Sequence, residues 1–164
     1  FTNMKNKPSQ SPEDELLVMT GSDDGYVRSW AGLSAKPNPR PFRIGTGVAT
    51  MAFSPERGLF AVGAAKYFAL WNYTRDRRDH AVASQIGDIR CVAFSPTGKQ
   101  VCWAAGLSLQ CIDVDDKLPV ATLRGFRGKV LSFAYTPDST RVFSASDDGQ
   151  LMLWWLQGRS KAVE

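Results

Sequence analysis

The chain has 164 residues, of which 43% are hydrophobic and 22% charged, a balance that favours one globular domain and excludes a disordered or fibrous chain. Its net charge of +4 permits an acidic partner or RNA without requiring either. All apolar runs fall short of the roughly 20 residues that a membrane-spanning helix needs, and the polar residues 1–15 do not have the pattern of a signal peptide.

The predicted elements are short strands separated by turns. An apolar run at 16–19 is followed by an Asp-Asp-Gly turn at 23–25 and a strand that ends at Trp30. A stiff proline-rich connection at 36–41 leads into a weaker strand at 41–44. The next series has strands at 48–53 and 59–62, one ending at Trp71, and a weaker one at 80–86. The series recurs at 89–94, 100–103, up to Ile112 and 119–123, and again at 130–135, 141–143 and up to Trp154.

The repeat has a period of 41 residues. Phe53, Phe94 and Tyr135 are spaced by 41, and each precedes a Ser-Pro or Thr-Pro turn. The residues that end the third strands, Trp30, Trp71, Ile112 and Trp154, recur at 41, 41 and 42. Four short antiparallel strands in about 40 residues are typical of a β-propeller blade. The predicted fold class is therefore all-β, a partial β-propeller of about four blades whose first and last members are incomplete.

The Phe-Ser-Pro turns, the Ser-Asp-Asp-Gly turns at 22–25 and 146–149, and the tryptophans at third-strand ends resemble the WD-repeat family over nearly the whole chain. The resemblance implies a single partial propeller over 1–164, with blades at 1–44, 45–86, 87–124 and 125–164. The first blade lacks most of its first strand, and the last is expected to lack its fourth. Because the family forms closed rings, we expect missing sequence, another chain or a second copy to supply the rest.

The chain departs from the family where a Gly-His pair usually precedes the first strand. The last blade has Gly125-Phe126 there, and the other blades lack the pair. The family's buried hydrogen-bond network would take a Ser or Thr, an Asp and a Trp from each end blade: Thr20, Asp24 and Trp30 in the first, and Ser144, Asp148 and Trp154 in the last. The middle blades have Val62 and Trp103 at the Ser/Thr position, so we expect apolar packing there.

Few groups suit catalysis or metal binding. The single histidine, His80, falls in a charged stretch at 75–80 and is expected to be a solvated loop residue. Cys91, Cys102 and Cys111 have no zinc-site or framework spacing, so three reduced, mostly buried thiols in a reducing compartment are expected. The Asp pairs at 23–24, 115–116 and 147–148 fall in turns. We expect no catalytic residue, no cofactor and no metal.

The resemblance implies a partner-binding face at the loops leading into the first strands. Its predicted residues are Gly47, Ala49, Asp88, Arg90, Phe126, Arg127, Lys129 and Leu131. Phe126 has two interpretations, as an exposed anchor for an acidic, partly apolar peptide or as a filler of the space that histidine would occupy. On the opposite face, Arg75, Arg77 and Arg78 are either solvated or contact RNA phosphates. Trp155 should face away from Trp154, at a blade interface or on a partner surface.

The functional hypothesis is a non-enzymatic WD-repeat scaffold that mediates protein–protein interactions within a larger complex in the cytoplasm or nucleus. Its partners are expected to be acidic or peptide-like, with no membrane contact. One alternative is a subunit of an RNA-processing or ribosomal particle, although no RNA-binding motif with stacked aromatics is present. The other is the regulatory propeller of a multidomain protein.

Overall fold

The computed structural model describes residues 17–31, 36–75, 77–83 and 87–156. The chain divides into two compact units, Phe1–Gly47 and Val48–Glu164. The regular structure of the described residues is antiparallel sheet with one 3₁₀ turn. None of these residues belongs to a helix that is long and apolar enough to cross a membrane.

The first unit holds one small sheet. Its hairpin, β1 (Leu17–Gly21) and β2 (Tyr26–Ala31), turns at Gly25, whose φ of 80° suits glycine. Two short strands, β3 (Lys36–Pro37) and β4 (Phe42–Arg43), both pair with β2. The predicted fourth strand at 41–44 corresponds to β4, whereas β3 lies in the stretch predicted as a connection. Prolines separate the two strands, because they cannot donate ladder hydrogen bonds. The predicted remnant of the first strand lies outside the described residues.

The second unit contains three sheets. The first sheet consists of β5 (Val48–Ser54), β6 (Leu59–Ala64), β7 (Tyr67–Asn72) and β8 (Arg77–Ala83), with a 3₁₀ turn, η2 (Pro55–Arg57), between β5 and β6. The second consists of β9 (Ile89–Phe94), β10 (Gln100–Ala105), β11 (Ser108–Asp113) and β12 (Pro119–Arg124). The third consists of β13 (Val130–Tyr135), β14 (Arg141–Ser146) and β15 (Leu151–Trp155).

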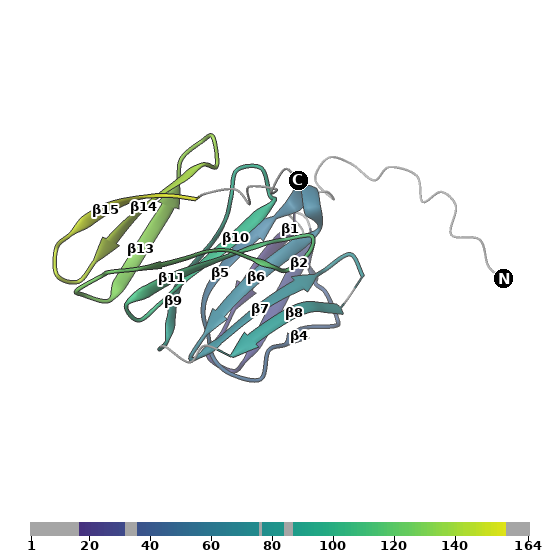
Figure 1. Cartoon of the computed structure of the whole chain (residues 1–164). Coiled ribbons are helices and arrows are strands. Elements are labelled where there is room, and N and C mark those ends of the chain that lie inside the picture. The colour runs from purple at the N-terminus through teal and green to yellow at the C-terminus, as the bar shows by residue number, and fades with distance from the viewer. Residues whose placement is uncertain (1–16, 32–35, 76, 84–86, 157–164) are drawn as a thin grey trace. The chain divides into compact units, whose positions relative to one another are not determined.

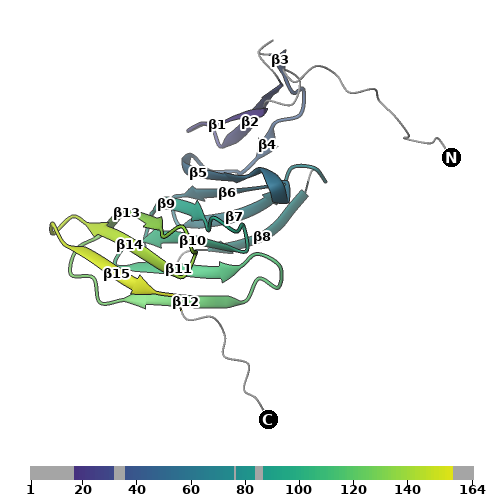
Figure 2. The same ribbon diagram turned by 90° about the horizontal axis from the view of Figure 1, so that it is seen from above.

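Each of these sheets is a meander in chain order, and the sheets stack through their first strands. The strand β5 lies beside β9, and β9 lies beside β13 (Figures 1 and 2). The three aromatic residues that are 41 apart in the sequence therefore sit at equivalent places in three equivalent sheets. This arrangement confirms the predicted fold class, antiparallel blades of a partial β-propeller.

Burial along the strands reflects how many faces of each sheet are covered. In β10, which lies between two neighbouring sheets, five of the six residues are buried, whereas β14 in the last sheet alternates between buried and more exposed positions. One core layer packs Phe68 and Leu70 of the first sheet of this unit against Ile89 and Trp103 of the second. A further layer packs β10 and β11 against β13 and β14.

A glycine sets the close approach of two of these sheets. A Cβ atom on Gly63 of β6 would lie 2.4 Å from the Ile89 Cγ2 atom and 2.6 Å from the Thr50 Cγ2 atom. Real Cβ atoms do not approach other carbons this closely, so a side chain at this position would force the sheets apart. The tight packing of β6 against β9 therefore depends on a residue without a side chain.

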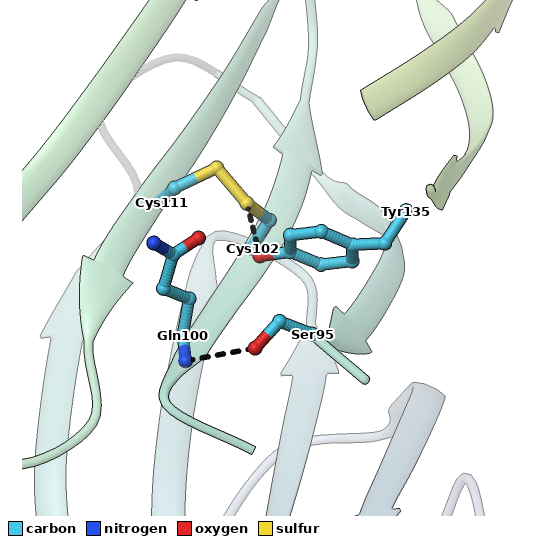
Figure 3. Close-up of a disulfide and its surroundings, with 5 residues drawn as sticks. All are labelled: Ser95, Gln100, Cys102, Cys111 and Tyr135. Carbon is cyan, nitrogen blue, oxygen red and sulfur yellow. Dashed lines mark hydrogen bonds between the residues drawn. A yellow bond between two sulfur atoms is a disulfide. The ribbon is translucent and has the colours of Figure 1, made fainter. Parts of the chain in front are cut away.

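The structure corrects the expectation of three reduced thiols. Cys102 of β10 and Cys111 of β11 lie directly opposite each other and form a disulfide, while Cys91 is free and half-buried. The Tyr135 hydroxyl on β13 lies 2.8 Å from the Cys102 sulfur, and Figure 3 shows this contact beside the disulfide. The physical reason for the error is the register of the β10–β11 hairpin, which brings two cysteines nine residues apart face to face.

The expectation for His80 was also wrong. The strand β8 begins at Arg77, three residues before the predicted start, and His80 pairs with Leu70 on β7. The imidazole is half-buried rather than solvated. Burial lowers the pKa of His80 below its usual value of 6.5, and the positive charge of Lys117 lowers it further.

Candidate functional site

The first strands of the second unit share one irregularity. In β5, β9 and β13 the pairing with the second strand skips a residue, and the skipped residues are Ala49, Arg90 and Leu131. A β-bulge leaves its extra residue unpaired and redirects its side chain. All three residues are exposed and recur every 41 residues, so the bulges place exposed residues at equivalent positions near the start of each first strand.

A cavity of ≈260 Å³ opens at this end, where the three sheets of the second unit meet. The loop before β9 contributes Gly87 and Asp88, the bulge contributes Arg90, and the loop before β13 contributes Lys129. The turns β6–β7 and β10–β11 complete the lining with Lys66 and Gly106. The cavity therefore gathers three cationic side chains and one carboxylate, with a formal charge of 3 − 1 = +2.

The backbone of Lys129 is held by hydrogen bonds at both its N–H and its carbonyl. The Asp147 carboxylate accepts the Lys129 N–H at 2.7 Å, and the Asp147 N–H donates to the Lys129 carbonyl at 3.0 Å. Next to Lys129, a Cβ atom on Gly128 would lie 2.3 Å from the Asp147 Oδ1 atom, so this close approach requires glycine. The neighbouring Val130 N–H donates to the Gly106 carbonyl at 2.9 Å. Asp147 thus positions the loop that carries a cation into the cavity.

Of the eight predicted contact residues, Asp88, Arg90 and Lys129 line this cavity. Ala49, Arg127 and Leu131 are exposed but do not line it. Gly47 belongs to the first unit, where a Cβ atom on it would lie 3.4 Å from the Asp23 backbone.

Phe126 is not part of the exposed surface, contrary to one of its two interpretations. Its side chain is 6% exposed, and its ring centroid lies 5.0 Å from that of Trp154 at an interplanar angle of 45°. The ring fills apolar space beside the tryptophan, and burying it there removes apolar area from water. Phe126 is therefore a core residue, and the predicted contact face loses its one aromatic member.

Sequence reasoning missed Lys66 and the positioning role of Asp147. Lys66 lies in a two-residue turn with a φ of 55°. A lysine in a turn is common, so the residue type and its position do not indicate a site. A signal for Asp147 existed in its Asp-Asp-Gly turn, which connects β14 to β15. Recognising it would have required the register between β13 and β14.

The predicted network residues of the two end blades form hydroxyl–indole pairs. The Trp30 Nε1–H donates to the Thr20 Oγ1 atom at 3.3 Å. The Trp154 Nε1–H donates to the Ser144 Oγ atom at 2.9 Å.

The two aspartates bond elsewhere. The Asp24 carboxylate pairs with Arg28 at 2.6 Å and accepts the Tyr26 N–H at 3.1 Å, and these contacts, the one with Arg28 above all, lower the pKa of Asp24. The Asp148 carboxylate accepts from the Ser146 hydroxyl and from the Gln150 N–H. No histidine connects the Asp to the hydroxyl–indole pair, and each Asp carboxylate instead bonds to residues of its own hairpin.

The cavity is suited to recognising an anion. Its cations are exposed to solvent and stand among backbone glycines that leave room for a ligand, as electrostatic recognition at an interface requires. Within the described part of the chain, no three His, Cys, Asp or Glu side chains come together to hold a metal ion.

Repeated antiparallel sheets that stack through their first strands define a protein of the β-propeller class. Comparison with protein families matches residues 117–154 to the family described as "WD domain, G-beta repeat". Together with the 41-residue repeat and the similar proteins below, this match shows that the chain belongs to the WD-repeat family.

Similar proteins support this membership. The chain is 31% identical over 121 residues to Telomerase Cajal body protein 1 of Bos taurus, an alignment that covers 68% of this chain and 22% of that protein. It is 24% identical over 159 residues to Protein LST8 homolog of Drosophila melanogaster (91% and 51%). It is 29% identical over 160 residues to Guanine nucleotide-binding protein subunit beta of Nicotiana tabacum (87% and 42%). The chain thus spans between about a fifth and half of the length of these relatives.

Proposed function

We propose that this chain is a non-enzymatic scaffold that holds a protein partner within a larger complex. The partner binds through an acidic, peptide-like segment at the cavity lined by Lys66, Asp88, Arg90 and Lys129. The observation that carries the proposal is the convergence of three cations from three different sheets on one cavity. These cations come from separate turns and loops, and cations that were only solvated would have no reason to converge.

The bulges support the same face. Ala49 and Leu131 stand at the position that Arg90 occupies in the middle sheet, and Leu131 is an exposed large apolar side chain beside the cavity-lining Lys129. An acidic segment with one apolar residue would pair its charges with the cations and cover Leu131. We therefore expect a mixed acidic and apolar peptide to bind more tightly than a purely acidic one.

We also propose that a further WD-type sheet covers the free face of β13–β15, supplied by more of the same protein or by another chain. The pair Phe143 and Leu153 is exposed or half-exposed there, at the register that the buried pair Cys102 and Cys111 holds one sheet earlier. Because the equivalent face is covered by a sheet inside this unit, the same kind of sheet fits here. The blade boundaries at 44, 86 and 124 belong to this proposal, as does a site of action in the cytoplasm or nucleus.

The test is peptide binding followed by fluorescence anisotropy. A labelled peptide that alternates glutamate and leucine is titrated with the whole chain and with the variant Arg90→Glu/Lys129→Glu. We expect the variant to weaken binding by about tenfold or more, because each lost charge-assisted contact is worth about 1.5–3 kcal/mol. Arg127→Glu is the matched control, since Arg127 is exposed and two residues from Lys129 but does not line the cavity.

Salt dependence separates this proposal from the alternative of an RNA-binding subunit. Binding of a single-stranded RNA that falls steeply between low and physiological salt would favour the ribonucleoprotein hypothesis. Peptide binding that persists at physiological salt would favour the scaffold. Equal weakening by Arg90→Glu/Lys129→Glu and Arg127→Glu would refute the assigned cavity.

A further inference from the structure

A second, larger cavity lies at the other end of the strands. Its volume is ≈390 Å³, and it lies between the first sheet of the second unit and the β11–β12 turn of the next sheet. Because the strands are antiparallel, the β5–β6, β7–β8 and β11–β12 turns all lie opposite the end that carries the smaller cavity. The charged residues that line it are four cations and two carboxylates: Arg57, Arg75, Arg77, Lys117, Asp79 and Asp115.

We infer that this cavity binds a phosphate monoester group. Two of the four cations are neutralised by carboxylates in the lining, which leaves a formal charge of 4 − 2 = +2. A phosphate monoester carries a charge of about −1.5 to −2 at neutral pH and offers three strong acceptor oxygens. Its charge therefore matches the charge of the cavity, whereas a carboxylate or a phosphate diester supplies a single negative charge.

One ion pair in the cavity connects the two sheets. The Arg57 Nη1 and Nη2 groups donate to the two carboxylate oxygens of Asp115 at 2.7 Å and 3.1 Å, a two-pronged contact. The pair fixes the 3₁₀ turn η2 beside the β11–β12 turn. The pKa of Arg57 is raised and that of Asp115 lowered by this contact, so both groups stay charged. The cavity wall is therefore preorganised before a ligand arrives.

The cations that face the ligand are held by local hydrogen bonds. The buried side chain of Asn72 accepts the Arg75 N–H at 2.9 Å and the Thr74 hydroxyl at 2.7 Å, which shapes the turn that carries Arg75. Lys117 adopts a φ of 61°, and its ammonium donates to the Val114 carbonyl, which leaves further N–H groups to donate. Arg77 uses its Nε–H on Asp79 at 3.0 Å, which leaves its terminal nitrogens for the ligand.

The positive charge of Lys117 acts on the sheet that lies across the cavity. Lys117 on the β11–β12 turn lowers the pKa of His80 on β8, so its charge acts across the boundary between the two sheets. The buried side chains of Leu59 and Val114 also line the cavity. Apolar lining weakens competition from water for the neighbouring donors. A phosphate group seated there would receive hydrogen bonds from both sheets at once.

The shape and chemistry favour a phosphate monoester over a nucleic-acid strand. The cations converge on one cavity instead of forming a track along a groove, and none of the described residues that line it is aromatic. Single-stranded nucleic acids are bound by a basic groove combined with aromatic stacking platforms. The cavity thus offers recognition of one phosphate but no platform for its flanking bases.

The test uses the whole chain labelled with ¹⁵N. It is titrated with N-acetyl-phosphoserine methylamide, with the unphosphorylated serine analogue, and with dimethyl phosphate as a diester. We expect saturable shifts of the Arg75, Arg77 and Asp115 to Lys117 amide signals with the phosphoserine probe. The serine analogue should cause none, and the diester should bind several-fold more weakly because it carries half the charge.

Two variants make the test specific, one inside the cavity and one on the same strand outside it. Arg75→Ala/Lys117→Ala should weaken phosphoserine binding by about tenfold or more, because two cationic donors are lost. Arg78→Ala also removes a cation on the same strand as Arg77, but the Arg78 guanidinium donates to the Tyr67 hydroxyl at 2.7 Å and does not line the cavity. This variant should change the affinity less than twofold, and both variants should keep the melting temperature of the parent chain.

The source of the phosphate is distinguished by one further probe. A nonapeptide with a central phosphoserine that binds more tightly than the small probe identifies a phosphorylated protein segment, and equal affinity identifies a small phosphate ester. The inference is overturned if the phosphoserine probe gives no saturable shift, if Arg78→Ala weakens binding as much as the double variant, or if a 12-nucleotide RNA binds here in preference. These outcomes are independent of the acidic-peptide assay, which reports on the opposite end of the strands.

Discussion

The indole of Trp103 on β10 lies almost flat against the ring of Phe68 on β7, with ring centroids 4.1 Å apart and planes 13° apart. Val101 pairs with Ile112 and Val142 pairs with Trp154, so these two valines occupy equivalent positions. Trp103 and Ser144 each follow their valine by two residues. Trp103 therefore takes the place that a hydroxyl takes in the last sheet. A hydroxyl–indole hydrogen bond within one sheet is replaced by an aromatic stack between two sheets.

Replacing Trp103 by alanine should cost about 3–5 kcal/mol of the free energy of unfolding, the usual range for large-to-small changes in a core. The side chain is 2% exposed, and the cavity left behind would also remove the support of Phe68. Urea denaturation followed by far-UV circular dichroism measures the loss. Trp155→Ala, at a side chain that is 63% exposed, should cost less than about 1 kcal/mol. Similar losses in the two variants would contradict the assigned stack.

The disulfide between Cys102 and Cys111 predicts the thiol content of the unfolded chain. Without a reductant, one thiol, that of Cys91, should react with Ellman's reagent in denaturant, and after reduction three should react. Closing a loop between residues nine apart stabilises the fold by about 2–3 kcal/mol in the chain-entropy account. The double variant Cys102→Ala/Cys111→Ala should lose about that much, while Cys91→Ala should lose less. Three reactive thiols before reduction would disprove the bond.

The architecture was predictable from the sequence because two separate sets of repeated residues mark the strands. The aromatic residues before the Ser-Pro turns mark the ends of β5, β9 and β13, and the tryptophans mark the third strands. Alternation of apolar residues then locates the strands between these markers. The fourth strands were less certain, because they are polar and mostly exposed. Their sequences contain little of the burial pattern from which strands are predicted, so β8 began earlier than expected and residues 36–43 formed two short strands.

The candidate cavity was predictable only in part. Asp88, Arg90 and Lys129 lie at fixed offsets from the repeated aromatic residues, so the alignment of the repeats found them. Lys66 lies in a turn of a different sheet, and only the stacking of the sheets brings it to the others. The choice between the two interpretations of Phe126 depended on its packing against Trp154, which a residue type and a spacing do not determine.

The single histidine allows a direct measurement of the field near the larger cavity. Because burial lowers the pKa of His80, its NMR titration midpoint should lie below the usual 6.5. Lys117→Ala should raise the midpoint, but by less than unfolding does, since burial is the larger cause. The unfolded chain then binds more protons than the folded chain below about pH 6.5, so the free energy of unfolding should fall as the pH falls through that range. His80→Gln should flatten this slope, and a midpoint at or above 6.5 would contradict the buried position.

The free face of β13–β15 predicts opposite outcomes for one substitution at two equivalent places. Leu109 of β11 and Leu151 of β15 occupy the same register, because Leu109 pairs with Ala104 as Leu151 pairs with Ala145. Leu109 is fully buried by the next sheet, whereas Leu151 is 80% exposed. Leu109→Ser should therefore cost about 3 kcal/mol or more, and Leu151→Ser no more than about 0.5 kcal/mol.

The same pair of variants tests whether that face associates with other molecules. Phe143, Leu151 and Trp155 are exposed together on one face, and the Arg141 guanidinium lies 5.5 Å from the Trp155 ring centroid. Contiguous exposed apolar area favours association, so the parent chain should sediment partly as oligomers at high concentration. Leu151→Ser should shift it toward the monomer without changing its stability. If sedimentation velocity shows the same distribution for both, or if Leu151→Ser destabilises the chain as much as Leu109→Ser, this face is already covered and the proposed docking of a further sheet fails.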